Sequence, residues 1–168
     1  MAEPVSFTDE KKGDPLREPP IRYLGYANEI GESFRSQIHV NYVRATYGLA
    51  TAYVIADAIH RGGQAAKKPW PSQDVRQTKI LWEVFDTLVW QGLASVIIPG
   101  FTINRICACS NFVLTKTLRM PAHVRKWTVT LIGLSSIPFI ISPIDNAVDH
   151  FMEATFRKYY KYEGPVLK

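Results

Sequence analysis

The run TLVWQGLASVIIPGFTIN, residues 87–104, carries no charged side chain and is bounded by Asp86 and Arg105. An apolar stretch of about 18 residues or more can cross the hydrocarbon core of a bilayer as a helix. The alternative is the central helix of a soluble bundle, which can also be apolar on every side. The length of the run favours a membrane helix, and this sets the class of protein that the rest of the chain has to fit.

The middle of this run predicts an irregular helix. Pro99 has no amide hydrogen to donate and Gly100 adds backbone freedom, so we expect a kink or a break beside them. Pro138 and Pro143 predict irregular backbone late in another apolar segment. Membrane helices tolerate such positions where neighbouring helices cover the freed carbonyl groups.

Three apolar segments are predicted to cross the membrane, at residues 40–59, 84–104 and 127–144. The first is the weakest, because only residues 45–56 of it lie between charges, a length that also suits a core helix. Residues 106–118 are apolar but few, and we interpret them as a re-entrant or an additional helix. The chain is therefore expected to have three or four crossings.

Small residues recur inside the apolar segments, where they let helix backbones approach closely. A small residue at every fourth position of the first segment forms one side of a helix, and the other two segments repeat a glycine followed by leucine and a small residue. The predicted helix-packing ridge consists of Gly48, Ala52, Ala56, Gly92 and Gly133.

The two ends of the chain are more polar. Residues 1–20 combine prolines with charges and are expected to be a disordered tail. Residues 146–162 predict an amphipathic helix, followed by a short tail at 163–168. Near the N-terminus, intervals of three and four residues predict one apolar helical stripe, made of Tyr23, Ala27, Ile30, Phe34 and Ile38.

The expected fold is therefore all-α. It is a polytopic helical membrane protein with about three to four hydrophobic helices and amphipathic helices at both ends. Residues 21–162 are expected to form a single membrane domain.

The basic residues are distributed along the chain, which has a formal net charge of +5. This distribution argues against a nucleic-acid partner, and the count on the two sides of the expected spans is too balanced to orient the chain. Residues 105–126 contain no acid, so the face that carries them should favour anionic lipid head groups. The predicted contacts are Arg105, Lys116, Arg119, Arg125 and Lys126.

Catalysis finds little support in the sequence. The four histidines are scattered, and no phosphate-binding loop, dinucleotide fingerprint or nucleophile elbow is present. We therefore predict no catalytic, cofactor or metal site. Charges that flank apolar segments mark either helix ends at the head groups or an ion or proton pathway. For the second reading, the candidates are Asp57, Asp86, Arg105 and Asp145.

Five stretches resemble the mitochondrial fission process protein family. They are RYLGYANEIGESFR from Arg22, YVIADAI from Tyr53, DTLVWQGLASVIIPGFTINRICA from Asp86, RKWT from Arg125 and IPFIISPIDNAVD from Ile137. The resemblance implies a multi-pass protein of the mitochondrial inner membrane that promotes or regulates fission and inner-membrane organisation. It transfers no catalytic residues.

The partners expected on this reading are the bilayer itself with an anionic lipid such as cardiolipin, other inner-membrane proteins, and a second copy of the chain. The N-terminus carries acids that a mitochondrial presequence lacks, so we expect an internal address. The alternative function is a small inner-membrane transporter or an ion or proton pathway.

Overall fold

The computed structural model describes residues 21–118 and 120–160, and all elements in these ranges are helical. The predicted all-α class is confirmed, whereas the predicted tails at 1–20 and 163–168 lie outside the described residues. The elements are the 3₁₀ helix η2 (Ile21–Tyr26), α1 (Ala27–Ser33), α2 (Val40–Lys67), α3 (Gln73–Gln91), the π-helical η3 (Gly92–Ile97), α4 (Ile98–Thr117), α5 (Ala122–Ala154) and α6 (Arg157–Tyr160).

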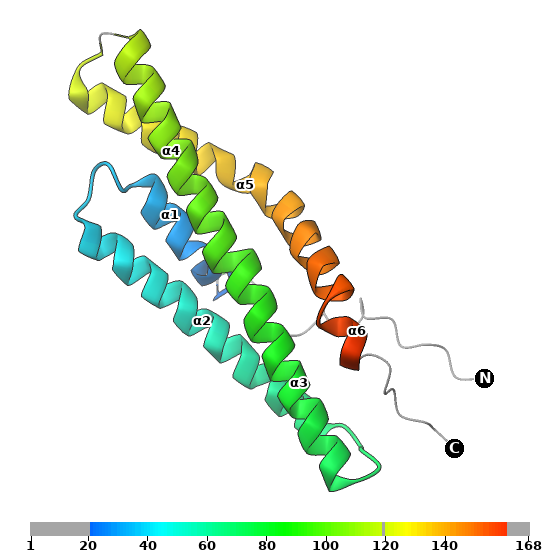
Figure 1. Cartoon of the computed structure of the whole chain (residues 1–168). Helices are drawn as coiled ribbons and strands as arrows, with labels where there is room; N and C mark the ends of the chain where they lie inside the picture. The colour runs from blue at the N-terminus through cyan, green and yellow to red at the C-terminus, as the bar shows by residue number, and fades with distance from the viewer. Residues whose placement is uncertain (1–20, 119, 161–168) are drawn as a thin grey trace.

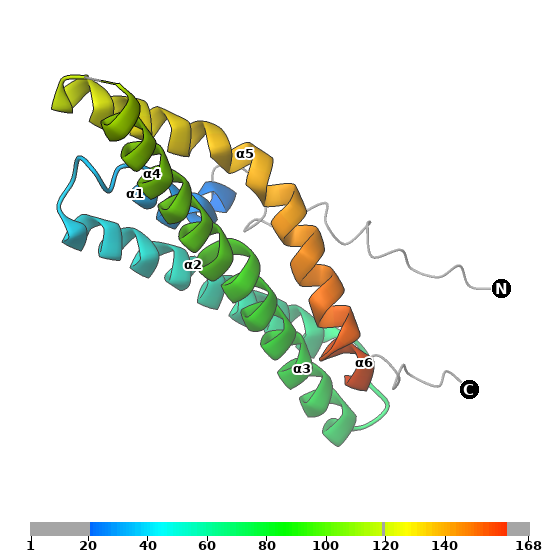
Figure 2. The ribbon, with the colours of Figure 1, turned by 45° about the horizontal axis from the view of Figure 1, so that its top comes forward.

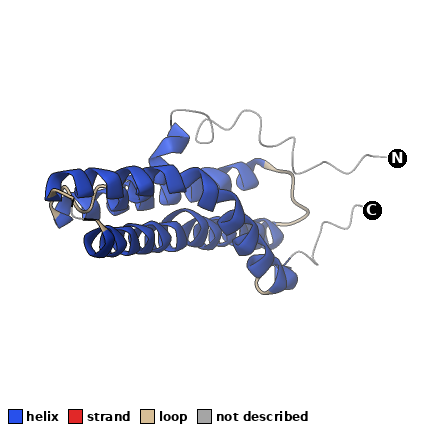
Figure 3. Ribbon diagram, turned by 90° about the horizontal axis from the view of Figure 1, so that it is seen from above, coloured by secondary structure: helices blue, strands red, loops and turns tan. Residues whose placement is uncertain are grey.

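Three long helical rods form the body of the molecule (Figure 1). Helix α3 runs back along α2 and continues through η3 into α4. Helix α5 then returns beside α4. The short helix α1 packs against α2, α4 and α5. Seen from above, the described residues consist of helices joined by short loops (Figure 3). Helix α1 therefore sits where the three rods meet.

Helix α2 covers the predicted first span, 40–59, and continues beyond it to Lys67. It begins after His39, whose Nδ1 accepts a hydrogen bond from the amide of Asn41 at 3.2 Å. Gly62 remains helical and is buried against α3, because a Cβ there would come within 2.6 Å of Val84 Cγ2. The polar stretch after residue 60 is therefore mostly helix.

Helices α3, η3 and α4 form one continuous helix of 45 residues, Gln73–Thr117. At 1.5 Å per residue it is about 67 Å long, roughly twice the thickness of a hydrocarbon core. Residues 106–118, which we interpreted as a re-entrant or additional helix, form the last part of α4. The reason is local: no glycine or proline interrupts the chain between Gly100 and Pro121.

The irregular backbone expected beside Pro99 lies directly before it, in the π-helical turns of η3. Proline provides no donor for the carbonyl four residues earlier, and a π turn pairs each carbonyl with the amide five residues on. Helix α5 contains Pro138 and Pro143 but is not interrupted there. Figure 2 shows α5 curving between its yellow and orange parts.

Two apolar clusters hold the rods together. The first joins Ala94 of η3 to Val148 and Met152 of α5. The second joins Ile103 and Cys107 of α4 to Val129, near the start of α5. The predicted C-terminal amphipathic helix is thus mostly a continuation of α5, whose buried face it extends.

Two helices are long and apolar enough to cross a membrane, by length and composition: Gln73–Thr117 and Ala122–Ala154. They contain the predicted spans 84–104 and 127–144. Their most apolar windows are only 33% and 17% buried, and Phe139 of α5 is 78% exposed. The apolar side chains of these helices therefore point largely outward.

Candidate functional site

The buried face of helix α1 is polar. Asn28, Glu29, Glu32 and Ser33 are each at most 2% exposed. Of the predicted apolar stripe, Ala27 is buried, whereas Tyr23 and Ile30 are 60% and 43% exposed. The packed face of α1 is therefore its polar face, and hydrogen bonds join Asn28 and Glu32 to η3, α2 and α4.

Glu32 is the centre of this polar cluster. Its two carboxylate oxygens accept hydrogen bonds of 2.6 Å each from Nε and Nη2 of Arg35. The hydroxyl of Tyr47 in α2 donates to the same carboxylate at 2.9 Å, and Nδ2 of Asn104 in α4 donates at 2.8 Å. Burial raises the pKa of Glu32, but these three partners together lower it below its ordinary value. The charged carboxylate therefore joins α1, α2 and α4.

Asn28 connects α1 to the irregular part of the long helix. Its Nδ2 donates to the main-chain oxygen of Val96, within η3, at 3.0 Å. Gly100 makes room for this contact, because a Cβ there would lie 3.1 Å from Asn28 Nδ2 and would collide with the hydroxyl of Tyr47. The π-helical turns and Gly100 thus form the surface on which α1 packs.

Two other glycines allow the same close approach. A Cβ on Gly31 of α1 would collide with the side chain of Thr46 in α2. A Cβ on Gly133 of α5 would lie 2.7 Å from Cys107 Sγ and 2.8 Å from Ser33 Oγ. Helix α1 therefore touches each neighbouring rod at a glycine.

Glu29 differs from Glu32 because neither of its carboxylate oxygens has a hydrogen-bond partner among the described residues. It is 1% exposed and lies near the carboxylate of Asp145 in α5. Burial raises the pKa of Glu29 to about 8; its own main-chain amide lowers it slightly, and the nearby carboxylate of Asp145 raises it. The side chain is therefore mostly protonated at neutral pH.

Two further polar contacts, one buried and one partly buried, join the helices at the other end of the bundle. Asp57 of α2 is fully buried and accepts hydrogen bonds from Arg61, at 3.3 Å, and from Gln91 of α3. Arg157 of α6 donates to both carboxylate oxygens of Asp86 in α3, at 2.8 and 2.9 Å. It also donates to Asp149 of α5 at 2.9 Å.

The four charges predicted for a transport pathway therefore occupy separate contacts. Asp57 joins α2 to α3, and Asp86 holds α6. Asp145 lies near Glu29. Arg105 is exposed on α4, where it donates to Asn104 Oδ1 at 2.6 Å and lies over the ring of Phe101. The structure does not bring these four residues together.

Three of the predicted lipid-binding residues flank the loop between α4 and α5. Lys116 and Lys126 are exposed and Arg125 is half-buried. Arg119 lies outside the described residues, and Arg105 lies about three helical turns before Lys116 in α4. The loop thus concentrates positive charge at one end of the bundle.

The predicted packing ridge is divided in the structure. Gly133 packs closely, as described above, but Gly48, Ala52 and Ala56 are exposed along α2. Gly48 and Gly92 have no neighbouring atom within 4 Å of an added Cβ. Gly48 and Gly92 therefore make no close helix contact among the described residues, and the role of this ridge in helix packing stays a prediction.

Within residues 21–118 and 120–160, no group of three or more histidine, cysteine or acidic side chains could hold a metal ion. Sequence reasoning missed the buried positions Asn28, Glu29 and Glu32, and also Arg157. One signal was available: in the α1 segment, the polar residues repeat at helical spacing as regularly as the apolar ones.

The bundle presents apolar side chains outward and joins its helices through buried hydrogen bonds, as expected of a helical membrane protein. The family model described as "Mitochondrial 18 KDa protein (MTP18)" matches residues 16–80 and 64–152. The chain belongs to this family of mitochondrial fission process proteins, as the resemblance of its sequence motifs had implied.

Curated relatives in three animals carry the name "Mitochondrial fission process protein 1". The Danio rerio protein is 51% identical, with 94% of this chain and 95% of the relative aligned. The Homo sapiens protein is 49% identical over 98% and 97% of the two chains. The Caenorhabditis elegans protein is 48% identical over 89% and 90%. No solved structure matches the chain.

The close contact at Gly31 yields a stability prediction. Gly31→Ala should lower the free energy of unfolding by about 1 to 3 kcal/mol, because the new methyl group overpacks the contact with Thr46. The measurement is thermal unfolding of the purified protein in a mild detergent. Gly48→Ala is the matched control: its methyl group meets open space, so it should be neutral or stabilise by up to about 1 kcal/mol. Equal destabilisation by both variants would contradict the packing of α1 on α2.

Glu29 yields a prediction about pH. The folded protein holds this proton more tightly than the unfolded chain, whose carboxyl group titrates near 4.5. Stability should therefore fall as the pH rises from about 4.5 to about 8 and then level off. Glu29→Gln should remove this part of the pH dependence of the melting temperature.

The control for this experiment is Glu153→Gln, which changes an exposed carboxylate of α5 and should keep the wild-type profile. A Glu29→Gln variant with an unchanged pH profile would show that Glu29 is not buried in the folded protein.

Proposed function

We propose that this chain is a multi-pass protein of the mitochondrial inner membrane that promotes fission and inner-membrane organisation without catalysing a reaction. The observation that carries the proposal is the outward orientation of the apolar side chains on the two candidate spans. The process comes from the family, whose members are named for mitochondrial fission.

Large apolar side chains cover the outside of both candidate spans. On the long helix, Ile97 and Phe101 are 60% and 63% exposed. On α5, Leu131 and Phe139 are 59% and 78% exposed. A soluble monomer rarely exposes a continuous apolar surface of this kind. In a bilayer the same surface faces acyl chains, so it supports membrane insertion.

The polar side chains of the bundle support a structural role. Glu32 joins three helices, Asn28 holds η3, and Arg157 binds the carboxylates of two helices. Hydrogen bonds of this kind stabilise helix contacts in lipid, where apolar burial gives no drive to associate. These groups are engaged in holding the bundle together, so we propose that the protein acts through its shape and its contacts.

The partners proposed for this role follow from the two kinds of exposed surface. The basic loop between α4 and α5 suits anionic lipid such as cardiolipin. The exposed small residues of α2, Gly48 and Ala52 among them, suit close contact with another helix. That helix would belong to another inner-membrane protein or to a second copy of the chain.

The test of the proposal begins with alkaline carbonate extraction of mitochondria that contain the full-length chain. The protein should stay in the membrane pellet, because carbonate removes peripheral proteins but not embedded helices. Protease treatment of mitoplasts and of intact mitochondria should then expose tagged termini only after the outer membrane is opened. Extraction into the supernatant would contradict the membrane assignment.

The fission role is tested in cells that lack the endogenous protein. Their mitochondria should be longer than normal, and wild-type protein should restore their length. Gly31→Ala should restore length less well than Gly63→Ala at equal expression, since only the first disturbs the packing of α1 and Gly63 lies in open space outside the proposed partner surface. Unchanged mitochondrial length in the depleted cells would contradict the role in fission.

The basic loop yields a separate prediction. Replacing Lys116, Arg125 and Lys126 together by glutamine should reduce the cardiolipin that remains bound after purification. The loss should approach about 3 kcal/mol of affinity, at about 1 kcal/mol per basic residue near an anionic surface. Lipid mass spectrometry of the purified protein measures the bound cardiolipin.

The matched control replaces Lys67, Lys68 and Lys158, three exposed basic residues away from the loop between α4 and α5, and should leave the bound cardiolipin unchanged. Equal losses from both ends would mean that net charge, and not the basic loop, determines lipid binding.

A further inference from the structure

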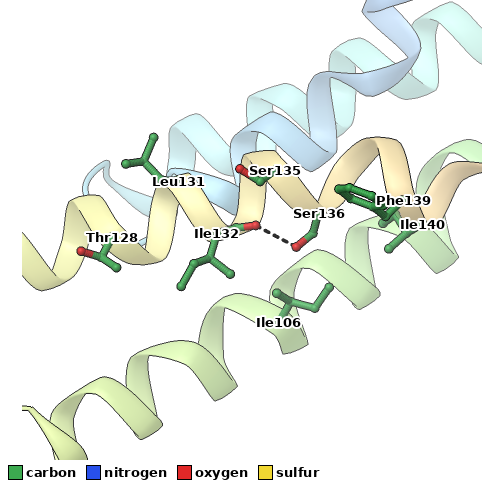
Figure 4. Close-up of a pocket in the computed structure, with 8 residues that line it drawn as sticks. All are labelled: Ile106, Thr128, Leu131, Ile132, Ser135, Ser136, Phe139 and Ile140. Carbon is green, nitrogen blue, oxygen red and sulfur yellow. Dashed lines mark hydrogen bonds between the residues drawn. The ribbon is translucent and has the colours of Figure 1, made fainter.

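A groove of about 560 Å³ runs along the outer surface between α4 and α5. Figure 4 shows Ile132 and Ser136 of α5 pointing toward α4, where Ile106 points back at them. The volume lies in the range of pockets that bind small ligands. The residues that line the groove are Ile106, Thr128, Leu131, Ile132, Ser135, Ser136, Phe139 and Ile140.

The hydroxyl groups in the groove are largely occupied by their own helix. Thr128 Oγ1 donates to the main-chain oxygen of Val124 at 2.9 Å, and Ser136 Oγ donates to that of Ile132 at 2.7 Å. These side chains therefore present mainly carbon to the groove. An occupant needs few hydrogen-bonding groups, which suits a flexible hydrocarbon chain.

The groove has the length of one acyl chain in one leaflet. From Thr128 to Ile140 the helix rises about 18 Å, close to half the roughly 30 Å thickness of a hydrocarbon core. Its Thr128 end lies beside the loop that joins α4 to α5, next to Arg125 and Lys126. The groove thus runs from a positively charged end to beyond the middle of the predicted span.

The charged end offers a partner for a phosphate group. Arg125 precedes Thr128 by three residues, which places both on the same face of α5. Its Nε is buried and has no hydrogen-bond partner among the described residues. Lys126 is exposed, and residues 105–126 contain no acid that would compete for these cations.

We propose that the α4–α5 groove binds one anionic phospholipid, with an acyl chain along α5 and the head-group phosphate at Arg125 and Lys126. The site rests on the proposed membrane function, because it needs α5 to lie in a bilayer with its Thr128 end at the interface. The basic loop between α4 and α5 would attract any anionic lipid, whereas this groove defines one place where a single lipid molecule binds.

The experiment uses the full-length protein in nanodiscs of phosphatidylcholine. One sample contains phosphatidylglycerol with a photoactivatable diazirine in the middle of one acyl chain. The other contains the same labelled chain on phosphatidylcholine. After illumination, mass spectrometry of peptides locates the labelled residues. We expect the anionic probe to label residues 128–140 preferentially, and the zwitterionic probe to label the exposed apolar surface evenly.

Two variants and one control test the two parts of the site. Ser135→Phe fills the groove without removing any hydrogen bond identified here, and should abolish the preferential labelling. Arg125→Gln should reduce the preference for the anionic probe about fivefold, the effect of one basic residue near a membrane surface. Ala108→Phe adds the same bulk to an exposed position of α4 outside the groove, and should leave the labelling unchanged.

The outcomes separate the site from the membrane assignment. Labelling spread evenly over α2, α4 and α5 by both probes would overturn the groove while supporting membrane insertion. Absence of labelling from both probes would overturn both proposals. Preferential labelling that persists in Ser135→Phe would also overturn the groove, because the acyl chain would then lie elsewhere.

Discussion

The arrangement of the helices depends on one buried carboxylate. Glu32 receives hydrogen bonds from Arg35 in the turn after α1, from Tyr47 of α2 and from Asn104 of α4. A buried charge is tolerated only when its partners replace the hydrogen bonds of water, and removing one partner of such a contact costs several kcal/mol. The positions of α2 and α4 are therefore fixed relative to α1.

The irregular features of the long helix fit this constraint. Pro99 requires a departure from regular α-helix, and the π-helical turns before it contain the carbonyl of Val96, to which Asn28 donates. Gly100 leaves the space that Tyr47 and Asn28 occupy. The sequence PG at 99–100, which predicts irregular backbone, is also what allows α1 to approach α4.

Much of the fold could be predicted from the sequence because its strongest signals are local. The uncharged run 87–104 indicated a membrane helix, and Pro99 indicated irregular backbone beside it. Pro138 and Pro143 suggested the same for α5, which is nevertheless uninterrupted. The continuity of α4 past Arg105 was missed, although no residue there stops a helix. Segment length alone was a poor guide to where one helix ends and another begins.

The buried polar cluster could not be predicted in the same way. Periodicity identified the two faces of α1 but not which face is buried, since the usual assignment assumes water outside the protein. If lipid surrounds the bundle, Ile30 can face outward and Glu29 and Glu32 can face inward. The partners that make this possible, Tyr47 and Asn104, are separated from Glu32 by 15 and 72 residues.

We expect α1 to face lipid with its apolar side and the bundle with its polar side. The most direct measurement is the collision rate of a spin label at Ile30, in bilayers, with oxygen and with a water-soluble nickel complex. Cys107 and Cys109 are replaced by serine so that the label is unique, and a label at Lys68 in the loop after α2 serves as the aqueous reference. A label at Ile30 should show a high collision rate with oxygen and a low one with nickel. A nickel collision rate as high as at Lys68 would contradict it.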